Sequence, residues 1–174
     1  MNNLADKAKK IKLAIFDVDG VLTNGSLVYG KEGIEHKQFH VHDGQGMKLL
    51  LQAGIQIGII TTCKSSMIAR RMQDLGITHV YQGQQDKREA YEDLKKKLNL
   101  TDEQILYVGD DFPDLPLLTR AGIGVSVANA PKIIHQYAAW VTKASGGQGA
   151  AREVCDFLLE TQGLYQTVLA TYLP

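Results

Sequence analysis

The stretch "IFDVDGVLTNG", residues 15–25, decides the fold and raises a question about charge. It begins as an apolar run typical of a buried strand and ends in two aspartates, Asp17 and Asp19, which one valine separates. At an effective dielectric constant near 20, two carboxylates about 4 Å apart repel each other by about 4 kcal/mol. Because a whole domain is stable by only roughly 5–15 kcal/mol, the arrangement predicts a cation at this site.

Length and composition indicate one globular domain spanning residues 1–174, with 44% hydrophobic and 22% charged residues. Lys and Arg total 19, as do Asp and Glu, so the net charge favours neither nucleic acid nor an anionic membrane as a partner. Residues 1–10 lack the apolar core of a signal peptide, and no apolar run approaches a membrane span, so we expect a cytoplasmic protein. Cys63 and Cys155 are too few for a disulfide framework.

Short apolar runs alternate with helical patterns, which is typical of βαβ units and of a parallel sheet covered on both faces. The alternation predicts an α/β fold with a doubly wound, mainly parallel sheet. Helix signals support it, because Ser65 and Ser66 precede a helical stretch that Gly76 ends, and Pro131 suits the first turn of a helix through Tyr137. The predicted strands are Lys12–Phe16, Ile55–Ile60, His79–Tyr81, Ile105–Val108, Ile123–Val127 and Ala139–Thr142.

Two segments lie outside this alternation. Residues 26–41 form two extended stretches around a Gly-Lys-Glu-Gly turn, which predicts a small β-hairpin insert and no cap domain. A C-terminal helix and an apolar tail are expected at residues 150–174, where either self-association or a folded-back tail would cover the apolar side chains. The glycine run Gly146–Gly149 is interpreted as a turn into this helix, with a phosphate-binding loop as the alternative.

Acidic residues gather where the predicted strands end. The fourth strand is followed by Asp110 and Asp111, with Asp114 one turn later, and Asp17 and Asp19 follow the first. In an open parallel sheet the carboxyl ends of the strands form the ligand crevice, so we expect these acids to converge. An all-oxygen ligand set without histidine or cysteine favours Mg²⁺.

A hydroxyl and a lysine accompany the acids. Thr61 follows the second strand, and Lys87 opens a helical stretch, where its charge opposes the helix dipole unless an anion lies nearby. Together with Mg²⁺ and the backbone N–H groups near Asp19 and Gly20, these groups suit a phosphate dianion. One aspartate of the pair can then attack phosphorus while the other transfers protons to and from oxygen.

These residues carry a family resemblance. "DVDGVLT", "IIT", Lys87 and "GDDFPD" resemble the four motifs of the haloacid dehalogenase (HAD) superfamily, in the expected order. The short insert, "FHVHDGQGMKLL", "LGITHVYQGQQDK" and "SGGQGAAREVCDFLL" resemble the capless C0-type phosphatases that act on 3-deoxy-D-manno-octulosonate 8-phosphate (KDO 8-phosphate) in lipopolysaccharide synthesis. The resemblance extends from about Ile11 to Leu164.

The resemblance implies a role for each acid at the strand ends. It implies that Asp17 is the nucleophile and a magnesium ligand. Asp19 would be the general acid/base and would bind the metal through its backbone carbonyl, and Asp110 would be the third protein ligand. Asp111 and Asp114 would support the waters of the metal or Lys87.

The resemblance also implies the phosphate ligands and the assembly. Thr61 and Lys87 would bind the phosphoryl group of a small phosphorylated sugar acid. Members of the family are usually homotetramers in which the hairpin of one subunit closes the active site of its neighbour. The C-terminal region would reach a neighbouring site as well.

Two positions differ from the family pattern. Thr62 and Cys63 stand where the family typically has Gly-Arg, and His42 stands where it has arginine. A neutral residue cannot replace the bidentate clamp that arginine forms on a carboxylate. We therefore expect substrate contacts at His42, Thr62 and Lys64, with another sugar phosphate, such as a nonulosonate 9-phosphate, as the alternative substrate.

The same residues allow three other interpretations. His36, His40 and His42 would suit zinc if His40 and His42 shared a strand face, although exposed hairpin histidines are the commoner case. A signalling receiver domain also combines acids, magnesium, threonine and lysine, but its phosphate-accepting aspartate stands alone after the third strand. A non-catalytic assembly domain is the remaining alternative.

Overall fold

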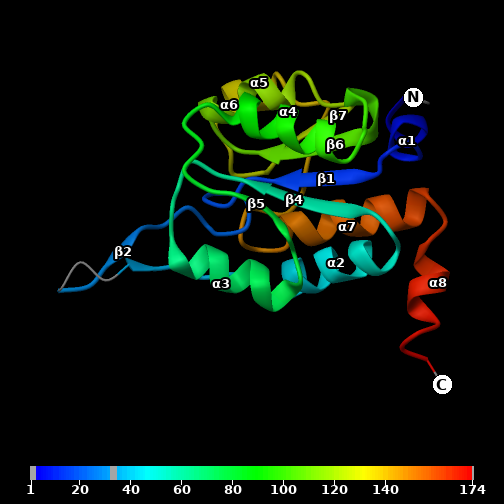
Figure 1. Ribbon diagram of the computed structural model, residues 1–174, viewed down its shortest axis with the longest axis horizontal. Helices are drawn as coiled ribbons and strands as arrows, with labels where there is room; N and C mark the ends of the chain where they lie inside the picture. The colour runs from blue at the N-terminus through cyan, green and yellow to red at the C-terminus, as the bar shows by residue number, and fades with distance from the viewer. Residues whose placement is uncertain (1–2, 32–34, 174) are drawn as a thin grey trace.

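Six parallel strands form the central sheet in the order β5-β4-β1-β6-β7-β8 (Figure 1). The computed structural model describes residues 3–31 and 35–173. The strands of the sheet are β1 (Leu13–Phe16), β4 (Gln56–Ile60), β5 (His79–Tyr81), β6 (Ile105–Gly109), β7 (Ile123–Ser126) and β8 (Trp140–Val141). All pairings within the sheet are parallel, which confirms the predicted strands to within a few residues at their ends.

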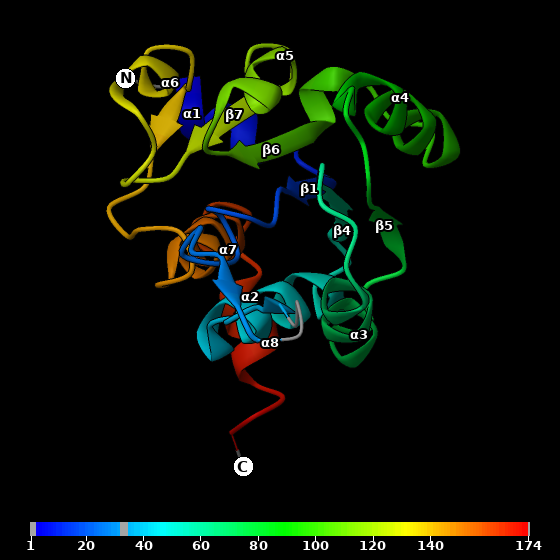
Figure 2. The same cartoon turned by 90° about the vertical axis from the view of Figure 1, so that its left-hand side faces the viewer.

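Helices cover both faces of the sheet, as Figures 1 and 2 show: α4, α5 and α6 lie on one side, and α2, α3 and α7 on the other. This arrangement confirms the predicted doubly wound α/β fold. The α-helices are α1 (Asn3–Ala8), α2 (Val41–Gln52), α3 (Ser66–Leu75), α4 (Lys87–Lys97), α5 (Leu115–Leu118), α6 (Lys132–His135), α7 (Ala150–Thr161) and α8 (Tyr165–Leu169). Two 3-10 helices are η1 (Asp102–Gln104) and η2 (Phe112–Asp114).

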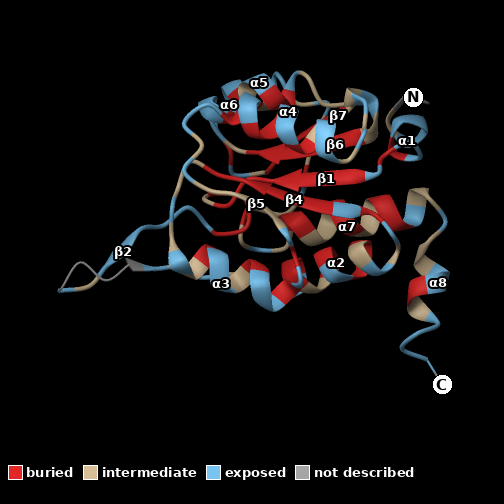
Figure 3. Ribbon diagram, viewed as in Figure 1, coloured by how far each residue is buried: buried red, intermediate tan, exposed pale blue. Residues whose placement is uncertain are grey.

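Strand β1 lies at the centre of the sheet and of the core. Every residue of β1 is buried, and Figure 3 shows the buried band that runs along the sheet between the two helical layers. Phe16, its last residue, is paired with Ile59 of β4 on one side and with Val108 of β6 on the other. The residues that follow these three strands therefore meet at one edge of the sheet.

Helix α3 begins and ends where the capping residues in the sequence predict. The Ser65 hydroxyl accepts a hydrogen bond from the Met67 N–H at 3.2 Å, and Gly76 ends the helix with a left-handed backbone, φ 74°. Helix α6 is shorter than predicted, since it ends at His135 and not at Tyr137. Pro131 precedes it with an extended ψ of 139°, so the proline lies outside the first turn.

The insert after β1 contains a two-stranded antiparallel sheet, β2 (Val28–Tyr29) with β3 (Glu35–His36). It extends away from the body of the molecule (Figure 1). The predicted strand face shared by His40 and His42 is wrong, because α2 already begins at Val41. Met47 and Leu50 of this helix are buried, and the helix packs along α7, so tertiary burial decides for helix over strand.

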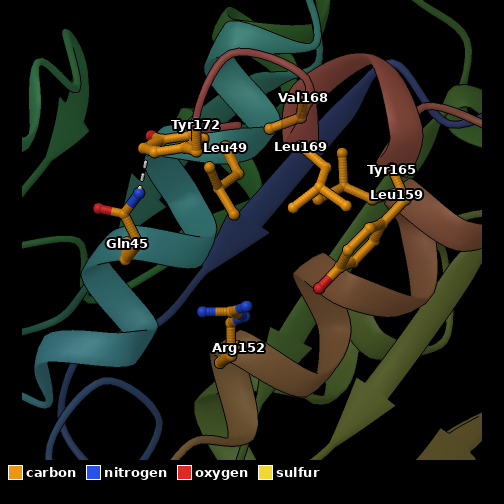
Figure 4. A pocket seen from close by; sticks show the side chains of 8 residues that line it. All are labelled: Gln45, Leu49, Arg152, Leu159, Tyr165, Val168, Leu169 and Tyr172. Carbon is orange, nitrogen blue, oxygen red and sulfur yellow. Dashed lines mark hydrogen bonds between the residues drawn. The ribbon is translucent and has the colours of Figure 1, made fainter. Parts of the chain in front are cut away.

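The C-terminal tail folds back over α2. Gln45 donates to the Tyr172 hydroxyl at 3.0 Å, and Gln52 donates to the Thr171 hydroxyl at 2.9 Å. Residues of α2, α7, α8 and the tail line an open cavity of about 190 Å³. Figure 4 shows their side chains around it. Its lining residues are Gln45, Leu49, Arg152, Leu159, Tyr165, Val168, Leu169 and Tyr172. In the described ranges, no helix has the length and apolar character needed to cross a membrane.

Candidate active site

The site lies at the carboxyl ends of the three central strands. Asp17 follows β1, Thr61 follows β4 and Asp110 follows β6. Asp17 and Thr61 are buried, and Asp110 is half-buried. The structure thus brings together side chains that lie more than 40 residues apart in the sequence, as expected from the strand pattern.

Carboxylate oxygens of Asp17, Asp110 and Asp114 lie within 4.8 Å of one another. In the part of the chain that the structure describes, these three residues form the group able to hold a metal ion. The donors are all oxygens, which fits a hard divalent cation such as Mg²⁺. The donor set and its burial therefore suit the metal that the sequence predicts.

Lys87 is the counter-charge of this cluster. It is only 2% exposed although it opens helix α4, so its charge is not directed into solvent. Its Nζ lies 3.0 Å from Asp17 Oδ1 and 2.6 Å from Asp114 Oδ1. Burial by itself lowers the pKa of Lys87, but the two carboxylates outweigh burial and raise this pKa above its ordinary value.

The carboxylate of Asp114 is held by four donors. Lys87 and the Tyr107 hydroxyl donate to Oδ1, and the N–H groups of Asp110 and Asp111 donate to Oδ2 at 2.9 Å and 3.1 Å. Both oxygens of Asp114 are therefore engaged within the protein. This arrangement suits Asp114 for holding Lys87 and the loop after β6, and it leaves Asp17 and Asp110 as the better metal ligands.

Burial and mutual repulsion disfavour the charged forms of two acids. The pKa of Asp17 is raised to about 7 by burial, an effect that Lys87 opposes and Asp114 reinforces. The pKa of Asp110 is also raised to about 7, first by burial and then by the charges of Asp17 and Asp114. Such a pair takes up protons readily near neutral pH and gains most from a nearby cation.

The loop after β1 approaches the loop after β6 at Gly20. Its φ of 89° lies in the left-handed region, and a Cβ on Gly20 would collide with Asp110 Oδ2. The Thr23 hydroxyl accepts hydrogen bonds from the N–H groups of Gly20 and Gly25 at 3.3 Å and 3.2 Å. Only glycine fits at position 20, where both the backbone conformation and the close approach exclude a side chain.

The glycine run before α7 packs on the same loop. Gly147 N–H donates to the Val21 carbonyl at 2.9 Å, and Gly146 N–H donates to Asn129 Oδ1 at 2.7 Å. A Cβ on Gly146 would collide with the Gly20 carbonyl oxygen. The run is therefore a turn that supports the loop bearing Asp19, and its N–H groups at positions 146 and 147 are already bound within the protein.

Asp19 lies at the mouth of the site and contacts the insert. Lys37 Nζ lies 2.6 Å from Asp19 Oδ1. Neither Lys37 nor Tyr107 stands out in the sequence, because Lys37 is one lysine within a polar hairpin and Tyr107 one aromatic residue within an apolar strand. Lys37 lies 18 residues from Asp19 and Tyr107 lies 7 residues from Asp114, and neither spacing is a recognised motif.

The remaining predicted site residues differ in exposure. Thr61 Oγ1 accepts a hydrogen bond from the Cys63 N–H at 3.2 Å, which orients the hydroxyl at the end of β4. Thr62 is half-buried, while Lys64 and His42 are exposed. Asp111 is exposed and accepts a hydrogen bond from the Phe112 N–H at 2.8 Å. Asp43 is buried and accepts one from the Arg152 N–H at 2.8 Å.

Comparison with known proteins agrees with this geometry. The profile of the haloacid dehalogenase-like hydrolases matches residues 73–154. The 3-deoxy-D-manno-octulosonate 8-phosphate phosphatase KdsC of Escherichia coli K12 is 46% identical over 157 residues, which cover 90% of this chain and 84% of the relative.

Two solved structures show the same fold over nearly the whole chain. A HAD superfamily (subfamily III A) protein from Legionella pneumophila has a TM-score of 0.96 and 51% identity, and the match covers 99% of this chain and 94% of the other. The KDO 8-phosphate phosphatase of Moraxella catarrhalis, solved with a magnesium ion, a phosphate ion and KDO, has a TM-score of 0.96 and 43% identity over 99% of both chains.

The fold and the acidic site define a phosphoric monoester hydrolase of the α/β class. The chain belongs to the haloacid dehalogenase-like hydrolases and, within them, to the family of the KdsC phosphatases. This membership favours a hydrolase over the receiver-domain alternative.

Proposed function

We propose that this protein is a magnesium-dependent phosphomonoesterase that acts through an aspartyl-phosphate at Asp17. The observation that carries the proposal is the contact of the buried Asp17 carboxylate with Lys87, at 3.0 Å, beside Asp110. A buried acid that meets a lysine and a second acid suits attack on a phosphate dianion, whose charge the lysine and a metal ion offset.

The metal site consists of this chain's own oxygens. Asp17 and Asp110 offer carboxylates, and Asp19 offers its backbone carbonyl as the family resemblance implies. A bound Mg²⁺ supplies positive charge that offsets both the acids and the phosphoryl oxygens. Asp114 supports the site indirectly, since its two oxygens hold Lys87, Tyr107 and the loop that bears Asp110 and Asp111.

Each step is assigned to a named group. Lys87 and the Thr61 hydroxyl bind phosphoryl oxygens and orient the phosphorus toward Asp17. Asp17 attacks phosphorus, and Asp19 gives a proton to the departing ester oxygen. Asp19 then removes a proton from the water that attacks the aspartyl-phosphate, which regenerates Asp17 and releases inorganic phosphate.

The substrate that we propose is KDO 8-phosphate, hydrolysed to KDO and phosphate in lipopolysaccharide biosynthesis. The names of the Escherichia coli and Moraxella catarrhalis relatives support it. The second candidate, another sugar phosphate such as a nonulosonate 9-phosphate, is favoured by Thr62, Cys63 and His42, which stand where the family resemblance places glycine and two arginines. If the substrate is a sugar acid, the cationic side chains that bind its carboxylate would lie at other positions of the chain.

The assembly is part of the proposal. We infer a homotetramer in which the insert reaches a neighbouring site, because Leu27, Val28 and Tyr29 of the insert are exposed apolar residues that another subunit would cover. The cytoplasmic location, the single domain and the absence of nucleic-acid or membrane partners stay predictions.

A phosphate-release assay tests the proposed function. KDO 8-phosphate, a nonulosonate 9-phosphate and p-nitrophenyl phosphate are compared with magnesium and with EDTA, using the wild type and Asp17→Asn. We expect magnesium-dependent release that prefers one sugar phosphate and that Asp17→Asn reduces by about 10³-fold or more. Equal release by Asp17→Asn would remove Asp17 from its role, and comparable turnover of all three substrates would contradict a narrow specificity.

A further inference from the structure

The insert places a buried cation on the proposed acid/base residue. Lys37 Nζ and Asp19 Oδ1 are 2.6 Å apart, and the lysine side chain is only 3% exposed, against 33% for the aspartate. Burial of an ammonium group is costly unless the group is paired and hydrogen-bonded. Ordering a long lysine side chain costs conformational entropy in addition. The contact therefore fixes Lys37 against the mouth of the site.

The chain around Lys37 is anchored to the body of the protein. Phe39 packs against the hydrophobic core, and the Arg71 guanidinium of α3 lies 5.8 Å from the centre of its ring. Arg71 also donates to the His40 carbonyl at 3.4 Å, directly before α2 begins. Lys37 thus extends from the part of the insert that is fixed next to α2, so it can hold its partner in one place.

We propose that Lys37 is a positioning residue that holds Asp19 by Oδ1 and leaves Oδ2 for proton transfer. This inference rests on the proposed function, because it takes Asp19 to be the acid/base. In the first half-reaction the proton on Oδ2 passes to the ester oxygen as the bond from that oxygen to phosphorus breaks and the bond from Asp17 to phosphorus forms. In the second half-reaction, water gives a proton to Oδ2 of Asp19. At the same time the water oxygen bonds to phosphorus, and the bond between phosphorus and Asp17 breaks.

If Lys37 positions the general acid Asp19, its loss should affect substrates according to how basic their leaving groups are. Protonation of the departing oxygen matters most when the leaving group is a strong base. Phenolate, with a pKa near 10 as in tyrosine, needs the proton far more than p-nitrophenolate, whose charge the nitro group stabilises. Loss of Lys37 should therefore slow phenyl phosphate more than p-nitrophenyl phosphate, although the two substrates have nearly the same shape.

The test measures kcat/KM for both aryl phosphates with saturating magnesium, because kcat/KM reports the step in which the aryl group leaves. We expect Lys37→Met to lower kcat/KM by about 10- to 100-fold for phenyl phosphate and by less than about threefold for p-nitrophenyl phosphate, as a share of the roughly 10²–10⁴-fold that general acid–base catalysis contributes. Lys37→Arg, which keeps a charged donor, should restore most of the loss.

Two controls separate positioning from a general loss of structure. Lys95→Met removes a lysine that lies 2.9 Å from Asp102 outside the site, and it should leave the ratio of the two substrates unchanged. In a double-mutant cycle, Lys37→Met should add almost nothing to Asp19→Asn, because both changes remove the same interaction. If Lys37→Met does not fold by circular dichroism, Lys37→Gln takes its place in both measurements.

Several outcomes would overturn the inference. Values of kcat/KM within about twofold of the wild type for both substrates, equal losses for both, or full additivity with Asp19→Asn would each contradict it. Asp17→Asn is measured in parallel on p-nitrophenyl phosphate. If that variant keeps its activity, the proposed function fails and takes the inference with it, whereas an inactive Asp17→Asn beside an unaffected Lys37→Met refutes the role of Lys37 alone.

Discussion

Gly20 and Asp110 lie so close that a methyl group on Gly20 would collide with the Asp110 carboxylate. Gly20 belongs to the loop after β1 and Asp110 to the loop after β6. The two acid-bearing loops are therefore tightly packed against each other. The backbone of the first loop, which carries Asp19, is held directly against the proposed metal ligand.

Gly20→Ala should weaken magnesium binding. The new methyl group would displace the Asp110 carboxylate, and the left-handed backbone would cost about 1–2 kcal/mol besides. Gly54→Ala is a matched control, since Gly54 has a similar φ of 87° but open space at its Cβ. We expect both variants to lose stability in urea denaturation and only Gly20→Ala to lose magnesium affinity in calorimetric titration. Equal magnesium affinity in the two variants would contradict the steric argument.

Removal of Lys87 should destabilise the protein strongly at pH 8. Lys87→Met leaves the buried Asp17 and Asp114 without their cation, and breaking a buried ion pair costs about 3–5 kcal/mol. The free energy of unfolding is measured by urea denaturation without magnesium. Lys87→Met combined with Asp114→Asn should recover part of the loss, because one uncompensated charge is removed.

The exposed lysine of the same helix, Lys96, supplies the control for Lys87. Lys96→Met should change the free energy of unfolding by no more than about 0.5 kcal/mol. A loss in Lys96→Met as large as that in Lys87→Met would show that helix propensity, and not the buried charges, sets the effect.

The metal-free protein should become less stable as pH rises from 6 to 8. The pKa of Asp17 and the pKa of Asp110 are about 7 in the folded state, against an ordinary value of 3.8, so the folded state binds more protons than the unfolded state between these values. Stability therefore falls as pH rises through this window. Magnesium binds the ionised carboxylates, so it should raise the melting temperature more at pH 8 than at pH 6.

Thermal denaturation in EDTA and in magnesium at the two pH values checks this sign. The reference is the double variant Asp17→Asn/Asp110→Asn, which keeps His79, a residue whose pKa is lowered by burial and which contributes the opposite slope near pH 6.5. The wild type should lose more stability than the double variant between pH 6 and pH 8. If, in EDTA, the melting temperature of the wild type rose from pH 6 to pH 8 by more than that of the double variant, the raised pKa values of Asp17 and Asp110 would be refuted.

Thr61→Val should weaken phosphoryl binding with little change in fold. Valine keeps the shape of the buried side chain at the end of β4 and removes the hydroxyl. We expect kcat/KM for p-nitrophenyl phosphate to fall by about 10-fold, because a hydrogen bond to a charged group contributes roughly 1.5 kcal/mol. Thr119→Val, at the exposed residue that follows α5, removes a hydroxyl bonded to backbone carbonyls of its own segment and should leave kcat/KM unchanged. Similar losses in both variants would exclude a specific role for Thr61.

Local patterns in the sequence were sufficient to predict the parallel sheet and to predict that the acids converge at one edge of it. Buried parallel strands are continuous apolar runs, and their carboxyl ends share one edge of the sheet, so Asp17, Thr61 and Asp110 could be placed together from the strand pattern. The α3 boundaries followed in the same way from Ser65 and Gly76, because capping depends on a few adjacent residues.

The tertiary structure decided what depends on contacts between distant segments. It buried Lys87 between Asp17 and Asp114, engaged both oxygens of Asp114, and placed Lys37 of the insert on Asp19. It also made residue 41 the start of a helix, where the sequence predicted the end of an extended stretch. The physical reason is that burial, pairing of charges and packing of one helix on another are properties of neighbours in space, which spacing along the chain does not encode.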